Sequence, residues 1–201
     1  MHIPSSDTFK INVLTFDEAL VSTNDDYNKD KWLYVPDFYS EYRYILGTRG
    51  EKPLICIGIN PSTAEPENLD NTLKSVERIA LANGFDSFIM FNVYAQRATN
   101  PDDMEHECNT LLHKENMKAF EYILRLSREP AIWAAWGNII EKRPYLPVCV
   151  QSMIELGEMF NAAWYSAGMI SKKGHPHHPL YLRKDTPLDP FDIKAYIKKL
   201  S

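Results

Sequence analysis

The fold is decided by one stretch of the sequence, Leu54-Ile55-Cys56-Ile57-Gly58-Ile59-Asn60-Pro61-Ser62-Thr63-Ala64. Its first half is a continuous apolar run, which is typical of a strand buried on both faces of a parallel sheet. The run ends at Asn60-Pro61, because proline cannot donate the backbone hydrogen bond that would continue a strand. A polar loop follows, and a helix begins near Asp70. This pattern predicts a loop at the carboxyl edge of an α/β sheet, where such folds bind ligands.

The rest of the chain repeats this alternation of strands and helices. It predicts a single domain over residues 1–201, a three-layer α/β/α sandwich with a central, mostly parallel sheet of about four strands. Residues 1–35, with a turn-rich cluster at 24–28, are expected to form an N-terminal appendage packed on that domain. Strands are predicted at 41–47, 54–60, 87–93, 131–137 and 162–166, and helices at 70–83, 113–128, 147–160 and after 189–190.

The composition of the 201-residue chain is that of an ordinary globular domain, with 44% hydrophobic and 24% charged residues. The net charge of -5 argues against a broad basic surface for duplex nucleic acid, although it leaves room for a small basic cleft. Three widely spaced cysteines form no metal-ligand pattern and no disulfide framework, which predicts a reduced, cytoplasmic compartment. The chain shows no signal peptide and no apolar run long enough for a bilayer, so we expect no membrane partner.

Polar side chains follow four of the predicted strands. If these strands are parallel, their loops meet at one edge of the sheet and form a ligand site there. The side chains in question are Asn60, Ser62 and Thr63, then Asn92, Tyr94 and Arg97, then Trp136, and finally Lys173, His175, His177 and His178.

Each of these groups also has a purely structural interpretation. The segment Asn60-Pro61-Ser62 can be a simple turn, Asn92 can satisfy loop amides, and Trp136 can be a core aromatic residue. The histidines have no Cys, Asp or Glu at metal-site spacing, so we expect neither a metal nor a cofactor. Ser62 lacks a Gly-x-Ser-x-Gly elbow, which leaves a Ser/His hydrolase as an alternative only.

A series of motifs occurs in a fixed order along the chain: Gly58-Ile59-Asn60-Pro61-Ser62-Thr63-Ala64, Asp70 and Thr72, Asn92-Val93-Tyr94-Ala95-Gln96-Arg97-Ala98-Thr99, Asn116, Ala135-Trp136-Gly137, and Gly174-His175-Pro176-His177-His178-Pro179-Leu180-Tyr181-Leu182. In these motifs, over about residues 53–183, the sequence resembles the domain-of-unknown-function family numbered 1643. That family has no established biochemical activity, so this resemblance implies no reaction.

A more distant resemblance, to the uracil-DNA glycosylases, implies a chemistry. Gly58-Ile59-Asn60-Pro61-Ser62 is similar to the loop whose Asp or Asn positions the attacking water in those enzymes. Phe91-Asn92 is similar to their strand end that reads the base edge, and His175-Pro176-His177-His178-Pro179-Leu180 to their His-Pro loop, which stabilises the leaving base. Two departures stand out: Ser62 replaces a glycine, and the His-Pro loop has one extra residue, so that His175 and His178 compete for one role.

The resemblance implies a uracil-DNA glycosylase-like fold and hydrolysis of an N-glycosidic bond in a nucleobase-containing small molecule or single-stranded nucleic acid. Asn60 would hold the water, and a histidine would donate to the leaving base. We favour His178 over His175, because Pro179 restricts its backbone and His175 lies next to flexible Gly174. The expected substrate-binding residues are Ser62, Thr63, Asp70, Asn92, Tyr94, Arg97, Trp136 and Lys173.

Two of these residues carry a more specific hypothesis. Arg97 and Lys173 are expected to bind an anionic part of the ligand, such as a phosphate. The structural alternative for Arg97 is a pair with Asp70 or Asp102. For the whole protein, the alternatives to a glycosidase are a non-catalytic module that binds a nucleotide or modified base, and a hydrolase that uses Ser62 or Thr63 with a histidine.

Overall fold

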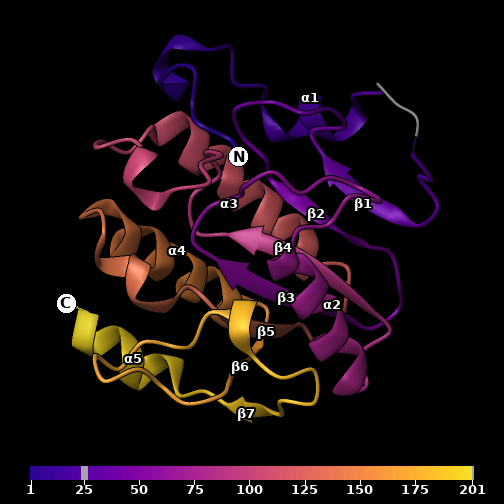
Figure 1. The fold of residues 1–201 in the computed structure, drawn as a ribbon, viewed down its shortest axis with the longest axis vertical. Coiled ribbons are helices and arrows are strands. Elements are labelled where there is room, and N and C mark those ends of the chain that lie inside the picture. The colour runs from indigo at the N-terminus through magenta and orange to yellow at the C-terminus, as the bar shows by residue number, and fades with distance from the viewer. Residues whose placement is uncertain (24–26, 201) are drawn as a thin grey trace.

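The computed structural model of the chain describes residues 1–23 and 27–200, so part of the predicted turn-rich cluster, residues 24–26, lies outside the described residues. Within these ranges, seven strands form one sheet in the order β1-β2-β4-β3-β5-β6-β7. Figure 1 shows this order, from β1 at the upper right to β7 at the bottom. The strands are β1 Trp32–Val35, β2 Ile45–Thr48, β3 Pro53–Gly58, β4 Ser87–Asn92, β5 Ala131–Ala134, β6 Ala163–Ala167 and β7 Leu188–Pro190.

The α/β class is confirmed, but the predicted sheet is corrected in two respects. The sheet is mixed: β4, β3, β5 and β6 are parallel, whereas β1, β2 and β7 are joined antiparallel. It also has seven strands within the described residues instead of about four. The missed strands are short edge strands. In β7, Pro190 argues against a strand in the sequence, yet proline is compatible with a sheet edge.

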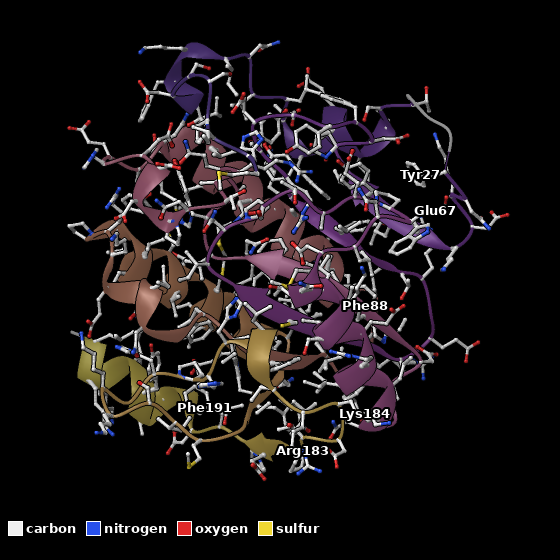
Figure 2. All side chains as sticks on the ribbon, viewed as in Figure 1. Tyr27, Glu67, Phe88, Arg183, Lys184 and Phe191 are labelled. Carbon is white, nitrogen blue, oxygen red and sulfur yellow. The ribbon has the colours of Figure 1, made fainter. Side chains whose placement is uncertain are left out.

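The two faces of the sheet carry separate hydrophobic cores, which gives the molecule three layers. On one face, helix α2 (Asn71–Ala82) packs through Leu73, Val76 and Ile79. The side chain of Phe88, labelled in Figure 2, belongs to the same cluster. The other face is covered by α1 (Phe16–Val21), α3 (Thr110–Leu124), α4 (Tyr145–Met159) and α5 (Ile193–Leu200), whose apolar side chains form the larger core.

Side-chain caps explain where the helices begin. Asp70 accepts a hydrogen bond from the Leu73 amide at 2.9 Å, which starts α2 at the predicted place. Helix α3 begins at Thr110, three residues before the predicted His113, because the side chain of Asn109 caps it. The cap therefore determines the first turn more than the apolar pattern does.

The N-terminal segment is joined to the domain by its own strand and by buried polar contacts. Strand β1 lies within residues 1–35, so the part of the predicted appendage outside the sheet ends before Trp32. Thr8 donates from its amide and its hydroxyl to the buried carboxylate of Glu105, and Asn109 donates to the Thr8 hydroxyl at 3.1 Å. These bonds hold the N-terminal segment against the start of α3.

Gly47 tests the pairing between the antiparallel edge and the parallel centre. A Cβ at Gly47 would lie 2.3 Å from the Phe88 carbonyl oxygen and 2.7 Å from the Ile89 Cα, which are backbone atoms of β4. We expect Gly47→Ala to lower the free energy of unfolding by at least about 2 kcal/mol, measured by denaturant titration.

The matched control for this variant is Gly157→Ala in α4. There the nearest atom is a Trp164 side-chain carbon at 3.3 Å, and alanine favours the helix by about 1 kcal/mol. Its free energy of unfolding should stay within about 1 kcal/mol of the wild type. Equal destabilisation by both substitutions would contradict the role given to Gly47.

Candidate functional site

A pocket of about 510 Å³ lies where strands β3 and β4 end. The arrowheads of these two strands point the same way in Figure 1, as the parallel register requires. The pocket also takes in the start of α2, the residue that follows β5 and the short 3-10 helix Pro179–Tyr181. The sequence-predicted residues that line it are Asn60, Ser62, Thr63, Asp70, Asn92, Trp136 and His178.

The side-chain amide of Asn60 is held in one orientation. Its Nδ2 atom donates to the carbonyl oxygens of Ala98, at 2.6 Å, and Pro61, at 3.0 Å. Both acceptors are carbonyls, so the nitrogen must face them and Oδ1 must face away. Oδ1 accepts no hydrogen bond from any residue that the structure describes. The half-exposed amide therefore presents a free acceptor at the pocket.

Asn92 presents the opposite group. Its Oδ1 accepts a hydrogen bond from the Arg43 guanidinium at 3.3 Å, which fixes the amide because arginine can only donate. Its Nδ2 atom is buried and has no partner among the described residues. Asn116 donates to the Asn92 carbonyl oxygen at 3.0 Å and so anchors the strand end from the other face of the sheet. Asn92 thus offers one free donor.

Gly58 makes room beside this donor. It pairs with Asn92 in the parallel ladder. A Cβ at Gly58 would lie 2.6 Å from the Met90 methyl carbon and 3.2 Å from the Asn92 Nδ2. Glycine at this position therefore leaves room for the Met90 methyl group and for the Asn92 amide, which a Cβ would displace.

His178 lies on the pocket wall as a neutral imidazole. Its Nδ1 accepts a hydrogen bond from the Leu180 amide at 3.3 Å, so the proton of the neutral ring is on Nε2. Burial, together with the neighbouring His177, holds the pKa of His178 below its usual value, although Asp70 acts in the opposite direction. His178 therefore provides a neutral N–H donor at neutral pH.

His175 does not line the pocket. It is buried, its Nδ1 is 2.9 Å from the Tyr196 hydroxyl, and its Nε2 is 3.0 Å from the Glu141 carboxylate. The Tyr196 hydroxyl also accepts a hydrogen bond from the Trp136 indole at 2.8 Å. This chain of hydrogen bonds links the His-Pro loop to α5 and to the pocket-lining Trp136. His175 therefore connects these elements and does not face the pocket.

Three further predicted binding residues lie outside the pocket lining. Arg97 is buried beneath the Asn60–Ala64 loop, where it donates to the carbonyl oxygens of Ser62 and Ala64 and, at 2.9 Å, to the Tyr34 hydroxyl. The proposed pair of Arg97 with Asp70 or Asp102 is absent from the described residues. Tyr94 is buried against Glu105, and Lys173 is exposed and paired with Glu141.

The hydroxyl groups of the loop form no catalytic dyad. Ser62 Oγ is 3.0 Å from Thr99 Oγ1, and within residues 1–23 and 27–200 it has no histidine partner. In the same ranges, no three His, Cys, Asp or Glu side chains come together as a metal site. No helix of these ranges is both long and apolar enough to cross a membrane.

Arg43 and Met90 are pocket residues that the sequence analysis missed. Arg43 stands between Tyr42 and Tyr44 in an otherwise apolar stretch, and a charge in such a place is a signal that could have been used. Met90 gives no such signal, because a methionine in a strand is ordinary.

The comparisons with known proteins give one result. A family model described as "Protein of unknown function (DUF1643)" matches residues 43–180. Neither a curated protein nor a solved structure matches the chain. The matched segment contains every pocket-lining residue from Arg43 to Leu180 and excludes Tyr34 and Tyr196.

The neutral state of His178 predicts a pH dependence of stability. Because its pKa is lower in the folded chain, the unfolded chain binds the proton more tightly, and stability is lost as the pH falls through about 6.5. In His178→Asn, the asparagine can keep the cap on Leu180 without titrating. Between about pH 7.5 and about pH 5.5, the wild type should lose more unfolding free energy than this variant does.

The variant also serves as the control for His113, whose pKa is lowered by burial and which is present in both proteins. Parallel pH profiles for the two proteins would show that His178 is not held neutral.

Proposed function

Since the chain belongs to the DUF1643 family of proteins of unknown function, we propose a function from its pocket: recognition of a nucleobase and hydrolysis of the N-glycosidic bond that holds it. One observation carries the proposal. Asn60 Oδ1, Asn92 Nδ2 and His178 Nε2 are three polar atoms without partners among the described residues, and all three belong to residues of one pocket. The uracil-DNA glycosylase-like arrangement of three loops on a parallel sheet is part of this proposal.

The base is read by Asn92. Its free Nδ2 donates to an oxo group on the base edge, in the pocket that Gly58 also lines. The hydrogen bond from Arg43 fixes the orientation of the Asn92 amide. The site therefore favours a base that has a hydrogen-bond acceptor at this position over a base that has a donor there.

The reaction needs a water molecule and a stabilised leaving group. Asn60 Oδ1 accepts a hydrogen bond from the water, whose oxygen forms the new bond to C1′. The C1′–N bond breaks, and its electron pair stays on the base nitrogen. His178 donates its Nε2–H to the base, where negative charge develops. The water loses its proton to solvent or to Asp70, the one carboxylate that lines the pocket among the described residues.

A second hollow adjoins this pocket and shares His178 with it. It has a volume of about 550 Å³ and includes exposed Met169, Lys172 and His177. This space supports a substrate that extends beyond the base, as a nucleotide or a short single strand does.

Base release tests the proposal directly. The substrates are nucleosides, nucleotides and single strands that contain uracil, hypoxanthine or a damaged base. We expect wild-type protein to release one of these bases, and His178→Ala to lower the rate about a hundredfold or more. Asn60→Ala should lower turnover and leave substrate binding nearly unchanged, because the water acts in the chemical step.

The matched control is His175→Ala, which removes a histidine of the same loop outside the pocket. It should lower the melting temperature and leave the rate per folded molecule nearly unchanged. If the protein binds a base but releases no base from any of these substrates, the hypothesis of a non-catalytic binding module replaces that of an enzyme.

Gly58→Ala tests the base site without removing a polar group. The added methyl group would meet the Met90 methyl and the Asn92 amide, so the affinity for the base should fall about tenfold or more, measured by calorimetry. Gly157→Ala, which alters a glycine of α4 instead, should bind the base like the wild type. Unchanged binding by Gly58→Ala would place the base elsewhere.

A further inference from the structure

Two arginines near the pocket are buried without a counter-ion. Arg43 is 1% exposed and Arg97 is 0% exposed. Their hydrogen-bond partners are carbonyl oxygens, the Asn92 amide oxygen and the Tyr34 hydroxyl, and no carboxylate of a described residue pairs with either one. A buried charge is costly unless an opposite charge compensates it. This arrangement indicates that a negative charge belongs nearby.

The two guanidinium groups are close to each other. Both donate to the carbonyl oxygen of Ala64, Arg43 at 3.1 Å and Arg97 at 3.3 Å. Burial and the charge of Arg97 lower the pKa of Arg43 to about 9. Arg43 therefore remains charged at neutral pH and contributes a positive potential at this side of the pocket.

The two arginines differ in access to the pocket. Each has a buried Nε atom without a partner among the described residues, but only Arg43 lines the pocket. Arg97 does not line it, and its guanidinium lies 4.3 Å from the centre of the Tyr39 ring. Arg43 is therefore the cation that a bound ligand would meet.

The start of α2 adds neutral donors to the same pocket. Asn71 and Thr72 line it, and their amides belong to the first turn, where helix geometry provides no acceptor. The cap from Asp70 occupies only the Leu73 amide. Free amides at a helix N-terminus favour an anion, and the 12-residue α2 is long enough for its dipole to contribute.

We infer that the pocket holds a phosphate group between the N-terminus of α2 and Arg43, so that its ligand is a nucleoside monophosphate and not a nucleoside. This inference rests on the proposed function for the base and adds the charged part of the ligand. It replaces the phosphate role expected of Arg97 and Lys173, since Arg97 lies beneath the loop and Lys173 is paired with Glu141.

The charged and titratable groups around this position set the expected sign of each substitution. Arg43 faces Arg97, the Asp70 carboxylate, Tyr34 and Tyr39. Burial raises the pKa of both tyrosines, so they are neutral at neutral pH. Asp70 is therefore the one anion among them, and it opposes a phosphate.

Calorimetric titration with uridine 5′-monophosphate, uridine and inorganic phosphate tests the inference. Hydrogen bonds to a charged group are worth a factor of about ten to a hundred in affinity. We expect the monophosphate to bind more tightly than uridine by that factor, and the difference to shrink as salt is added. Inorganic phosphate should compete with the monophosphate.

Four variants separate a phosphate site from a structural cluster. Arg43→Met should remove the preference for the monophosphate, and Arg43→Lys should retain part of it. Asp70→Asn should strengthen monophosphate binding, because asparagine keeps the cap of α2 and removes the opposing charge. A purely structural Asp70 would not produce that gain. Lys173→Ala is the control and should leave the affinity unchanged.

The outcomes distinguish this inference from the proposed function. Equal affinities for uridine and its monophosphate would overturn the phosphate site and leave the base site standing. Binding of phosphate and the monophosphate without binding of uridine would support the phosphate site and count against the base site. If Arg43→Met fails to fold, Asp70→Asn and the salt dependence of the wild type still decide the question.

Discussion

The pocket depends on one carbonyl oxygen that accepts hydrogen bonds from two buried arginines. Ala64 closes the loop that follows β3, and its carbonyl accepts hydrogen bonds from Arg43 and Arg97. Arg97 also holds the carbonyl of Ser62. The loop has no ladder partner after Pro61, so these side-chain bonds replace the backbone bonds of a strand.

Residues from both ends of the chain support the site. Tyr34, on the edge strand β1, accepts a hydrogen bond from Arg97, and Tyr196, on α5, joins Trp136 to His175. Both tyrosines lie outside residues 43–180, the segment that the family model matches. The edge strand and the last helix therefore support the site from two opposite sides, while every lining residue comes from the matched segment.

The sequence predicted the elements that its apolar patterns mark and missed those that depend on long-range contacts. Strands β3 and β4 and the start of α2 follow from a buried run, a strand-ending proline and a capping aspartate. Strand β7 does not, because its three residues become a strand only by pairing with β6. In the site, Asn60, Asn92 and His178 were found from their places at strand and loop ends.

Arg43 could not be assigned to the site in the same way. Its charge between two tyrosines marks the position as unusual, but the residues around it do not show that the sheet order brings it to the end of β4. Arg97 and Tyr94 do not line the pocket for a related reason. Both follow the predicted strand end closely, yet their side chains turn beneath the loop or toward Glu105. Sequence position gives the edge of the sheet, and packing decides which side chains reach the pocket.

The buried polar groups of the pocket that have no partner among the described residues lower the stability of the folded chain. A buried donor without a partner destabilises a protein by about 1–3 kcal/mol, and Asn92 Nδ2 and Arg43 Nε are two such donors beside one another. The large cores on both faces of the sheet can offset that cost, but nothing in the packing requires it. In the proposed function, a bound ligand gives these two donors the partners that the described residues do not provide.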